Sequence, residues 1–277
     1  MRLKNCIITG GTSGLGLCLV KKFIKNNFFV HIIARDKIKI NKLTEDLKKE
    51  SFNSFKFYEA DISEKSEINK VLDKIKQLDK IDTLINNAGA MFIKKELNSK
   101  GLEKTLVVNY LSHFLLTKSL INLIIKNDKA RIINISSNVH KFARLDIGDL
   151  NLKKKYNGWI AYNNSKLMNL LFNYKLIRVY KGKVNSYAVH PGWLNTNFGN
   201  NNKSISRKFL NIIRKLFAKN PEKITNMIFD ICTNDKYFEH SGKYFTQDGE
   251  VKSSNISYNK DLQDKLWEQS LEMVKVE

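Results

Sequence analysis

The sequence of 277 residues predicts a single α/β domain over residues 1–277, built as a doubly wound, seven-stranded parallel sheet flanked by helices. Short apolar runs alternate with longer stretches in which apolar residues recur at helical spacing. The expected strands are apolar throughout, as in a parallel sheet that is covered on both faces. No repeat or linker divides the chain, so we expect one domain.

The elements follow this alternation along the chain. The first expected strand ends in glycines that lead directly into a helix. Each later strand is short and is followed by a helical pattern, except at the C-terminal end. The expected strands are residues 5–11, 28–36, 54–61, 81–89, 130–137, 183–192 and 242–250, and the expected helices are 15–27, 42–50, 66–78, 102–127, one that carries Tyr162, and 221–234.

The formal net charge of +21 invites comparison with proteins that bind nucleic acid or anionic membranes. The basic residues are mostly lysine and are spread along the chain, while Asn, Ile, Phe and Tyr are abundant. An AT-rich coding sequence accounts for that mixture, so we expect no nucleic-acid partner. One basic stretch, residues 203–219, has helical apolar spacing and could contact a membrane surface. A lid over a pocket, near residues 193–220, is the favoured interpretation.

Cysteine usage and the N-terminus indicate the compartment. Cys6, Cys18 and Cys232 are scattered without CxxC spacing, so we expect reduced thiols and no metal site. The sequence has no run of about 18 apolar residues. The N-terminus also lacks the features of a signal peptide. These observations predict a cytoplasmic protein.

A glycine-rich turn, TGGTSGLG at residues 9–16, lies between the first expected strand and the first expected helix. Glycine permits a tight turn and a close approach of the backbone to a ligand, and a helix N-terminus stabilises a pyrophosphate. The turn therefore predicts a dinucleotide site, the alternative being an ordinary strand-to-helix corner. The residues assigned to this site are Gly10, Thr12, Ser13, Gly14, Leu15 and Gly16.

The end of the second expected strand indicates which dinucleotide binds. An acid at this place commonly binds the ribose 2′-hydroxyl of NAD. Here Ala34 is followed by Arg35, whose planar guanidinium suits a 2′-phosphate. Asp36 follows and could instead form a local salt bridge. The sequence thus favours NADP(H) over NAD(H), and residues 61–62, Asp61 and Ile62, are expected beside the adenine.

The stretch AYNNSKLMN holds Tyr162 and Lys166 four residues apart in a helical pattern. This spacing places two side chains next to each other on a helix, so a phenol and an ammonium could touch there. The spacing is common by chance, and two ordinary surface residues are the alternative.

The ordered set of motifs resembles the short-chain dehydrogenase/reductase family. TGxxxGxG is followed by NNAG at residues 86–89, then Asn109, Ser137, YxxxK and HPG, in that family's order and over nearly the whole chain. The stretches VVNYLSHFLLT, YNNSKLMNLLF and GKYF are similar to its branch of retinol dehydrogenases and WW-domain oxidoreductases. Many retinol-active members carry an N-terminal membrane anchor, which we do not expect here, so retinoid is not assigned as the substrate.

The resemblance implies a Rossmann fold and an oxidoreductase that uses NADP(H) to interconvert a lipophilic aldehyde or ketone and its alcohol. It implies that Tyr162 donates the proton, while Lys166 lowers the pKa of Tyr162 from about 10 and holds the nicotinamide ribose. Ser137 would bind the substrate carbonyl. Asn109 would bind a water that links Lys166 to solvent, the alternative being a side chain that satisfies a helix kink. The other implied cofactor contacts are Asn87, Ala88, Gly89, Pro191, Gly192 and Thr196.

The same resemblance divides the chain into two halves, in which residues 1–135 mainly bind the cofactor and residues 136–277 form the catalytic and substrate half. Two other functions fit the sequence. One is an NADP-binding regulatory or scaffold protein with little turnover, and the other is a basic protein bound to a membrane surface. Light-dependent protochlorophyllide reductases are a more distant enzymatic alternative. Both a monomer and a homodimer are compatible with the sequence.

Overall fold

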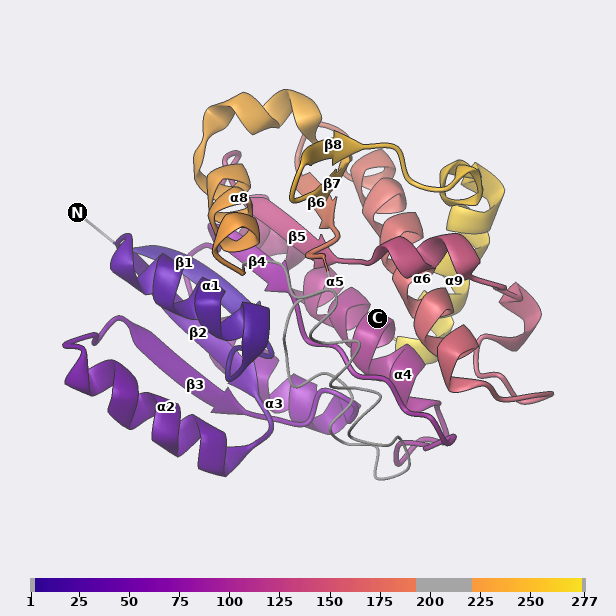
Figure 1. The fold of residues 1–277 in the computed structure, drawn as a ribbon, viewed down its shortest axis with the longest axis horizontal. Helices are drawn as coiled ribbons and strands as arrows, with labels where there is room; N and C mark the ends of the chain where they lie inside the picture. Colours follow the sequence, from indigo (N-terminus) through magenta and orange to yellow (C-terminus); the bar gives the residue numbers. More distant parts are fainter. Residues whose placement is uncertain (1–2, 193–220, 276–277) are drawn as a thin grey trace.

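The computed structural model describes residues 3–192 and 221–275, whose strands form one central sheet (Figure 1). The strand order is β3-β2-β1-β4-β5-β6-β7-β8, and all pairs from β3 to β7 are parallel. The predicted doubly wound α/β class is confirmed. The strands are β1 (Lys4–Thr9), β2 (Phe28–Ala34), β3 (Phe55–Glu59), β4 (Thr83–Asn86), β5 (Arg131–Ile135), β6 (Asn185–Val189), β7 (Tyr244–Thr246) and β8 (Gly249–Val251).

The edge of the sheet at β8 differs from the prediction. Residues 242–250, expected as one strand, form β7 and then turn back as β8, which pairs antiparallel with it. Gly249 has a φ of +113°, a conformation that glycine adopts without strain and that permits this reversal. In the part of the chain that the structure describes, the sheet therefore has eight strands instead of the predicted seven. At its other edge β3 ends at Glu59, before the expected end at Asp61.

Helices connect the strands and cover both faces of the sheet. One apolar cluster packs α1, α2 and α8 on one face, and another packs α3, α5, α6 and α9 on the other (Figure 1). Among the described residues, no helix has the length and apolar composition to cross a bilayer. The helices are α1 (Gly14–Lys25), α2 (Lys37–Lys49), α3 (Lys65–Ile75), α4 (Lys104–Leu106), α5 (Ser112–Ile124), α6 (Gly158–Val179), α8 (Pro221–Thr233) and α9 (Lys260–Val274), with 3₁₀ turns η2 (Asn138–Phe142), η3 (Ile147–Asp149), η4 (Asp235–His240) and η5 (Asn255–Tyr258).

The single helix predicted over residues 102–127 is interrupted near its start. It begins as α4, passes through a π-helical turn, η1 (Val107–Leu111), and continues as α5. The backbone N–H of Ser112 donates to the carbonyl of Val107, five residues back instead of four. Such a turn displaces a main-chain carbonyl from the regular ladder and is frequent at functional sites. Asn109 lies at its centre.

A buried polar network joins β4, β5, β6 and α6. The Asn86 amide donates to Asn134 over 2.9 Å, and the Asn134 amide donates to Asn173 over 3.2 Å and to Ser186 over 3.0 Å. All four side chains are at most 1% exposed. A buried amide is tolerated only when it is hydrogen-bonded, so the network favours one alignment of these four elements over any other.

Asn134→Ala is expected to lower the free energy of unfolding by about 2–3 kcal/mol, because it leaves buried partners without their hydrogen bonds. Urea denaturation measures this change. The control is Asn41→Ala at an exposed position of α2, for which we expect a change below about 0.5 kcal/mol. Equal stability of the Asn134 variant and the wild type would contradict a structural role for the network.

Candidate active site

The candidate site lies at the carboxyl ends of β1, β4, β5 and β6. β1 lies between β2 and β4 in the sheet, so the chain leaves β1 and β4 in opposite directions. In a doubly wound sheet this divergence opens the crevice in which ligands bind. The glycine turn follows β1, residues 86–89 end β4, Ser136 and Ser137 follow β5, and Pro191 and Gly192 follow β6.

The glycine turn packs backbone directly against backbone. Gly10 has a φ of +72°, and a Cβ on it would lie 2.9 Å from the Cα of Ala88. A side chain at Gly16 would overlap the carbonyl oxygen of Gly10. Both positions therefore require glycine if the turn is to lie against the end of β4.

The first turn of α1 is suited to an anion. The helix begins at Gly14 with Ser13 as its N-cap residue, and its first turn contains no acidic residue. Because the N–H groups at a helix N-terminus carry partial positive charge, this end favours a phosphate group. Thr12 lies in the turn before the helix, whereas the Leu15 side chain is buried in the apolar core.

A threonine at the end of β1 holds the segment that follows β4. The Thr9 hydroxyl accepts the backbone N–H groups of Asn87 at 3.0 Å and Ala88 at 2.9 Å. In return, the Asn87 side-chain amide donates to the carbonyl oxygens of Thr9 at 2.8 Å and Gly10 at 3.2 Å. These four bonds join the glycine turn and the NNAG segment into one rigid unit.

The two charged residues after β2 have different surroundings. Arg35 is exposed, at the point where β2 has ended. Asp36 caps α2, since its carboxylate accepts the N–H of Lys39 at 3.1 Å and pairs with the Lys39 ammonium at 3.1 Å. The local salt bridge that the sequence left open for Asp36 is therefore present. These bonds hold the pKa of Asp36 below its usual value.

The residues expected near the adenine lie just after β3. The Asp61 carboxylate accepts the backbone N–H of Ser63 at 2.9 Å, which shapes the turn into α3. Ile62 is buried in the core cluster, so it faces the sheet and not the surface.

Tyr162 and Lys166 lie side by side on α6. The Lys166 ammonium is 5.4 Å from the centre of the Tyr162 ring and donates to the carbonyl of Ile135 at 3.1 Å. Lys166 is 3% exposed, and this burial lowers its pKa to about 8. Burial raises the pKa of Tyr162, the opposite of the expected lowering.

The two serines after β5 differ in what their hydroxyls bond. The Ser136 hydroxyl is 1% exposed and donates to the main-chain carbonyl of Lys166 at 2.8 Å, which ties β5 to α6. Ser137 is 9% exposed, and its hydroxyl accepts the N–H of Val139 at 3.4 Å at the start of η2. The hydroxyl of Ser136 thus forms a buried structural hydrogen bond, whereas Ser137 is the more exposed of the two serines.

Asn109 is fully buried and its side chain is bonded on both ends. Its Oδ1 accepts the N–H of Ala90 at 2.7 Å, and its Nδ2 donates to the Ala90 carbonyl at 2.9 Å and to Ser165 Oγ at 3.0 Å. The side chain therefore bonds both backbone groups of Ala90, which lies beyond β4. These bonds link the π-helical turn to the segment after β4 and to α6.

Gly89 leaves a space beside the charged end of Lys166. A Cβ at this position would lie 3.7 Å from both Asn109 Oδ1 and Lys166 Nζ. The absent side chain thus leaves open the volume of a methyl group next to a buried ammonium and a buried amide. Together with the anion-favouring start of α1, these residues fit a nicotinamide dinucleotide.

The site extends to the end of β6. The His190 N–H donates to the carbonyl of Phe245 on β7 at 2.8 Å, and Pro191 and Gly192 follow, the latter with a φ of +78°. Thr196, the expected lid at residues 193–220 and the basic stretch 203–219 lie outside the described residues. Within the described residues, no cluster of His, Cys, Asp and Glu could hold a metal ion.

Two site residues were not assigned from the sequence, Thr9 and His113. Their side chains bond to each other, Thr9 Oγ1 to His113 Nε2 at 3.1 Å. Thr9 precedes the first glycine, and His113 follows Asn109 by four residues, one helical turn. That spacing was the available signal, since it places the side chains of Asn109 and His113 on one face of a helix.

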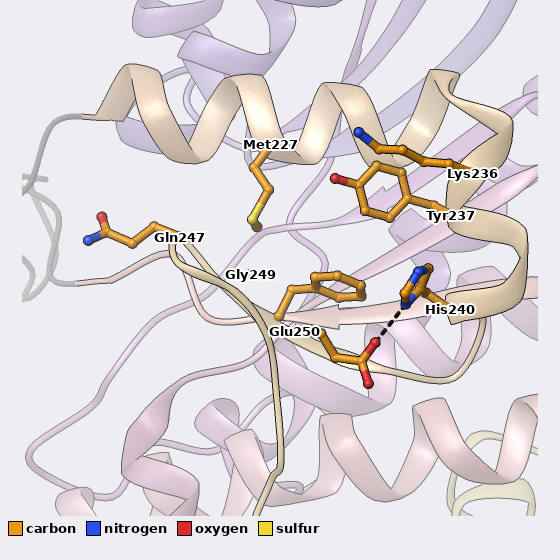
Figure 2. A pocket seen from close by; sticks show the side chains of 8 residues that line it. Met227, Lys236, Tyr237, His240, Gln247, Gly249 and Glu250 are labelled. Atoms are coloured by element: carbon orange, nitrogen blue, oxygen red, sulfur yellow. Dashed lines mark hydrogen bonds and ion pairs between the residues drawn. The ribbon is translucent and has the colours of Figure 1, made fainter.

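A second hollow, of about 450 Å³, lies between α8, η4 and the β7–β8 hairpin (Figure 2). A hydrogen bond between His240 Nδ1 and the Glu250 carboxylate, at 2.7 Å, crosses one side of it. None of the described site residues lines this hollow, so it is distinct from the candidate site. Its lining residues are Met227, Lys236, Tyr237, His240, Phe245, Gln247, Gly249 and Glu250.

Comparison with known proteins places the chain in a family. The sequence model of the short chain dehydrogenases matches residues 4–206. A human polyprenol dehydrogenase is 29% identical over 98% of this chain and 84% of its own. A mouse retinol dehydrogenase 13 is 30% identical over 98% of this chain and 84% of its own.

Solved structures share the fold. An uncharacterised protein from Mycobacterium paratuberculosis has a TM-score of 0.76 at 24% identity and covers 99% of this chain and 94% of its own. An NADPH-bound carbonyl reductase from chicken fatty liver has a TM-score of 0.65 at 20% identity, with 92% and 100% covered. From the family match and the two named relatives, the protein belongs to the short-chain dehydrogenase/reductase family, in its retinol dehydrogenase-like branch.

Proposed function

We propose that the protein is an NADP(H)-dependent oxidoreductase that interconverts a lipophilic aldehyde or ketone and the corresponding alcohol. The observation that carries this proposal is the Lys166 ammonium, buried beside Tyr162 and facing the space left by Gly89. Relatives named as polyprenol and retinol dehydrogenases support a lipophilic alcohol as the substrate class. We place the reaction in the cytoplasm, with residues 203–219 as a possible contact to a lipid surface.

The cofactor would be held along the edge of the sheet from β2 to β6. The glycine turn and the N-terminus of α1 bind the pyrophosphate, and the backbone after β3 lies beside the adenine. Beside Gly89, the Lys166 ammonium would bind the hydroxyl groups of the nicotinamide ribose. The backbone of Pro191 and Gly192, with Thr196, orients the nicotinamide. When bound, NADPH supplies the hydride, and the protein supplies orientation and the proton.

Tyr162 would handle the proton. Because burial raises its pKa, the phenol is protonated at neutral pH and ready to donate to the oxygen of a carbonyl substrate. The phenolate that results is stabilised by the Lys166 ammonium next to it. In the reverse direction, the same phenolate would take the proton of the alcohol. Ser137 donates a hydrogen bond to the substrate oxygen and holds it within reach of Tyr162.

The preference for NADP(H) rests on the charges after β2. Arg35 is exposed, so its guanidinium can reach a 2′-phosphate. Asp36 already accepts from Lys39 and the start of α2, which disfavours it as the acceptor of a free 2′-hydroxyl.

Tyr162→Phe is expected to lower kcat for carbonyl reduction by about 10²–10⁴-fold, because it removes the general acid. The Kd for NADPH should stay within about twofold, since the Lys166 ammonium is retained. NADPH oxidation over a panel of aldehydes, ketones, retinoids and steroids measures the first quantity. The control is Tyr174→Phe on the same helix, whose hydroxyl bonds to Ser253 and which should keep wild-type turnover. Wild-type kcat in the Tyr162 variant would refute the mechanism.

The rate should fall at high pH as Lys166 loses its charge. Its pKa is lowered to about 8 by burial, so the ammonium is present below that pH and is lost above it. We expect kcat/KM for NADPH, which reports the free enzyme, to be level below about pH 7 and to descend near pH 8. The Kd for NADPH over the same range separates binding from chemistry. A profile that stays level up to pH 10 would contradict the assignment.

Arg35→Ala is expected to raise the Kd for NADPH by about 10–100-fold, because it removes a charged hydrogen bond to the 2′-phosphate. The Kd for NADH, which lacks this phosphate, should change by less than about twofold. Titrations of the cofactor fluorescence measure both. Lys37→Ala, another exposed cation at the start of α2, is the control. Tighter binding of NADH than NADPH by the wild type would overturn the preference.

A further inference from the structure

His113 is a buried side chain near the candidate site to which the proposed mechanism assigns no role. It lies on α5 and is 2% exposed. Both of its ring nitrogens are bonded: Nε2 lies 3.1 Å from Thr9 Oγ1, and Nδ1 lies 3.2 Å from the main-chain carbonyl of Asn109. The ring thus bridges the end of β1 and the centre of the π-helical turn η1.

The donors and acceptors around Thr9 determine the form of this ring. A hydroxyl has one proton and two lone pairs. The Thr9 oxygen already accepts the N–H groups of Asn87 and Ala88, so its own proton must be donated. The nearer acceptor is His113 Nε2 at 3.1 Å, compared with the Ile85 carbonyl at 3.5 Å.

His113 is therefore neutral, with its proton on Nδ1. This proton is donated to the carbonyl of Asn109, which can only accept. A charged ring would carry a second N–H toward the donating Thr9 hydroxyl and would break that bond. Burial, with a contribution from the Lys166 charge, lowers the pKa of His113 to about 3, which agrees with a neutral ring.

The two bonds of His113 complete a ring of hydrogen bonds that holds residues 87–90. Thr9 holds the N–H groups of residues 87 and 88, and Asn109 holds both the N–H and the carbonyl of Ala90. Gly89 lies between these two sets of hydrogen bonds. Because it has no side chain, the position next to Lys166 Nζ that a Cβ would occupy is open. His113 connects Thr9 to Asn109, the two residues that form these sets of bonds.

We propose that His113 is a positioning residue, which ties Thr9 to Asn109 and so fixes residues 87–90 in the shape that binds the nicotinamide side of the cofactor. The proposal rests on the nicotinamide cofactor assigned under the proposed function. It assigns to His113 no contact with the substrate and no proton transfer.

A double-mutant cycle on the bond between His113 and Thr9 tests this role, with the Kd for NADPH as the measured quantity. His113→Phe keeps the ring volume without the two bonds, and we expect it to raise the Kd about tenfold. In a Thr9→Val background, where the link is already broken, the same substitution should change the Kd by less than twofold. In a Thr9→Ser background, which restores the hydroxyl, the tenfold effect should return.

A matched control is His31→Phe. His31 is also buried and also bonded on both nitrogens, to Tyr58 at 3.0 Å and to Asn5 at 3.3 Å, but it lies on β2 away from the glycine turn. We expect a lower Tm and an unchanged Kd for NADPH. If His113→Phe does not fold, His113→Asn replaces it in the cycle, because the shorter amide can still donate near Asn109 but does not reach Thr9.

The proposal is overturned if His113→Phe binds NADPH within twofold of the wild type, or if the effects of the His113 and Thr9 substitutions simply multiply. The proposed function has a separate outcome. Suppose that no carbonyl is turned over, but the His113 and Thr9 substitutions are coupled in their effect on the Kd for NADPH. That result would overturn the catalytic assignment alone. Suppose instead that the wild type turns over a carbonyl, but the two substitutions affect the Kd for NADPH independently. That result would overturn the role of His113 alone.

Discussion

The burial of one positive charge, the Lys166 ammonium, constrains the arrangement around it. An ammonium taken out of water is costly unless acceptors and polarisable groups surround it. Here the carbonyl of Ile135 accepts from it, and the Tyr162 ring lies beside it. Asn169 donates to the same carbonyl at 3.0 Å, and Ser136 holds the Lys166 backbone. The end of β5 and the middle of α6 can therefore take only one relative position.

The surrounding fold makes that position rigid. Parallel strands bring their carboxyl ends to one edge, and the buried amides of Asn86, Asn134 and Asn173 link the strands and α6 that carry the site. Asn109 uses its side chain to hold both backbone groups of Ala90, beyond β4. The site is thus assembled from backbone groups as much as from side chains. This explains why several of its positions must be glycine.

The sequence was sufficient for the fold class and the family. Apolar runs of fixed period and glycines between strand and helix are local signals, and the fold follows from them. The π turn at Asn109 was not predictable, because it shifts the hydrogen-bond register without changing the apolar spacing. The reversal after β7 was missed because its two strands are only three residues each.

The site residues divide in the same way. The sequence spacing predicted that Tyr162 and Lys166 lie side by side, as they do. It did not predict the direction of the Tyr162 pKa, because desolvation depends on which neighbours surround the ring in three dimensions. The role of Thr9 was hidden because its partners, Asn87, Ala88 and His113, are far from it in the chain. Such long-range pairs become visible only once the strands are assembled.

The antiparallel strand β8 has a consequence for the protein in concentrated solution. The outer edge of a sheet exposes unpaired backbone groups, which can recruit a strand from another molecule. Here the last strand is only three residues long and carries the exposed Glu250, and the opposite edge, β3, carries exposed Lys56 and Glu59. Short length and charge at both edges disfavour edge-to-edge aggregation. The β7–β8 hairpin therefore adds a strand to the sheet and also leaves an edge that disfavours pairing with a strand from another molecule.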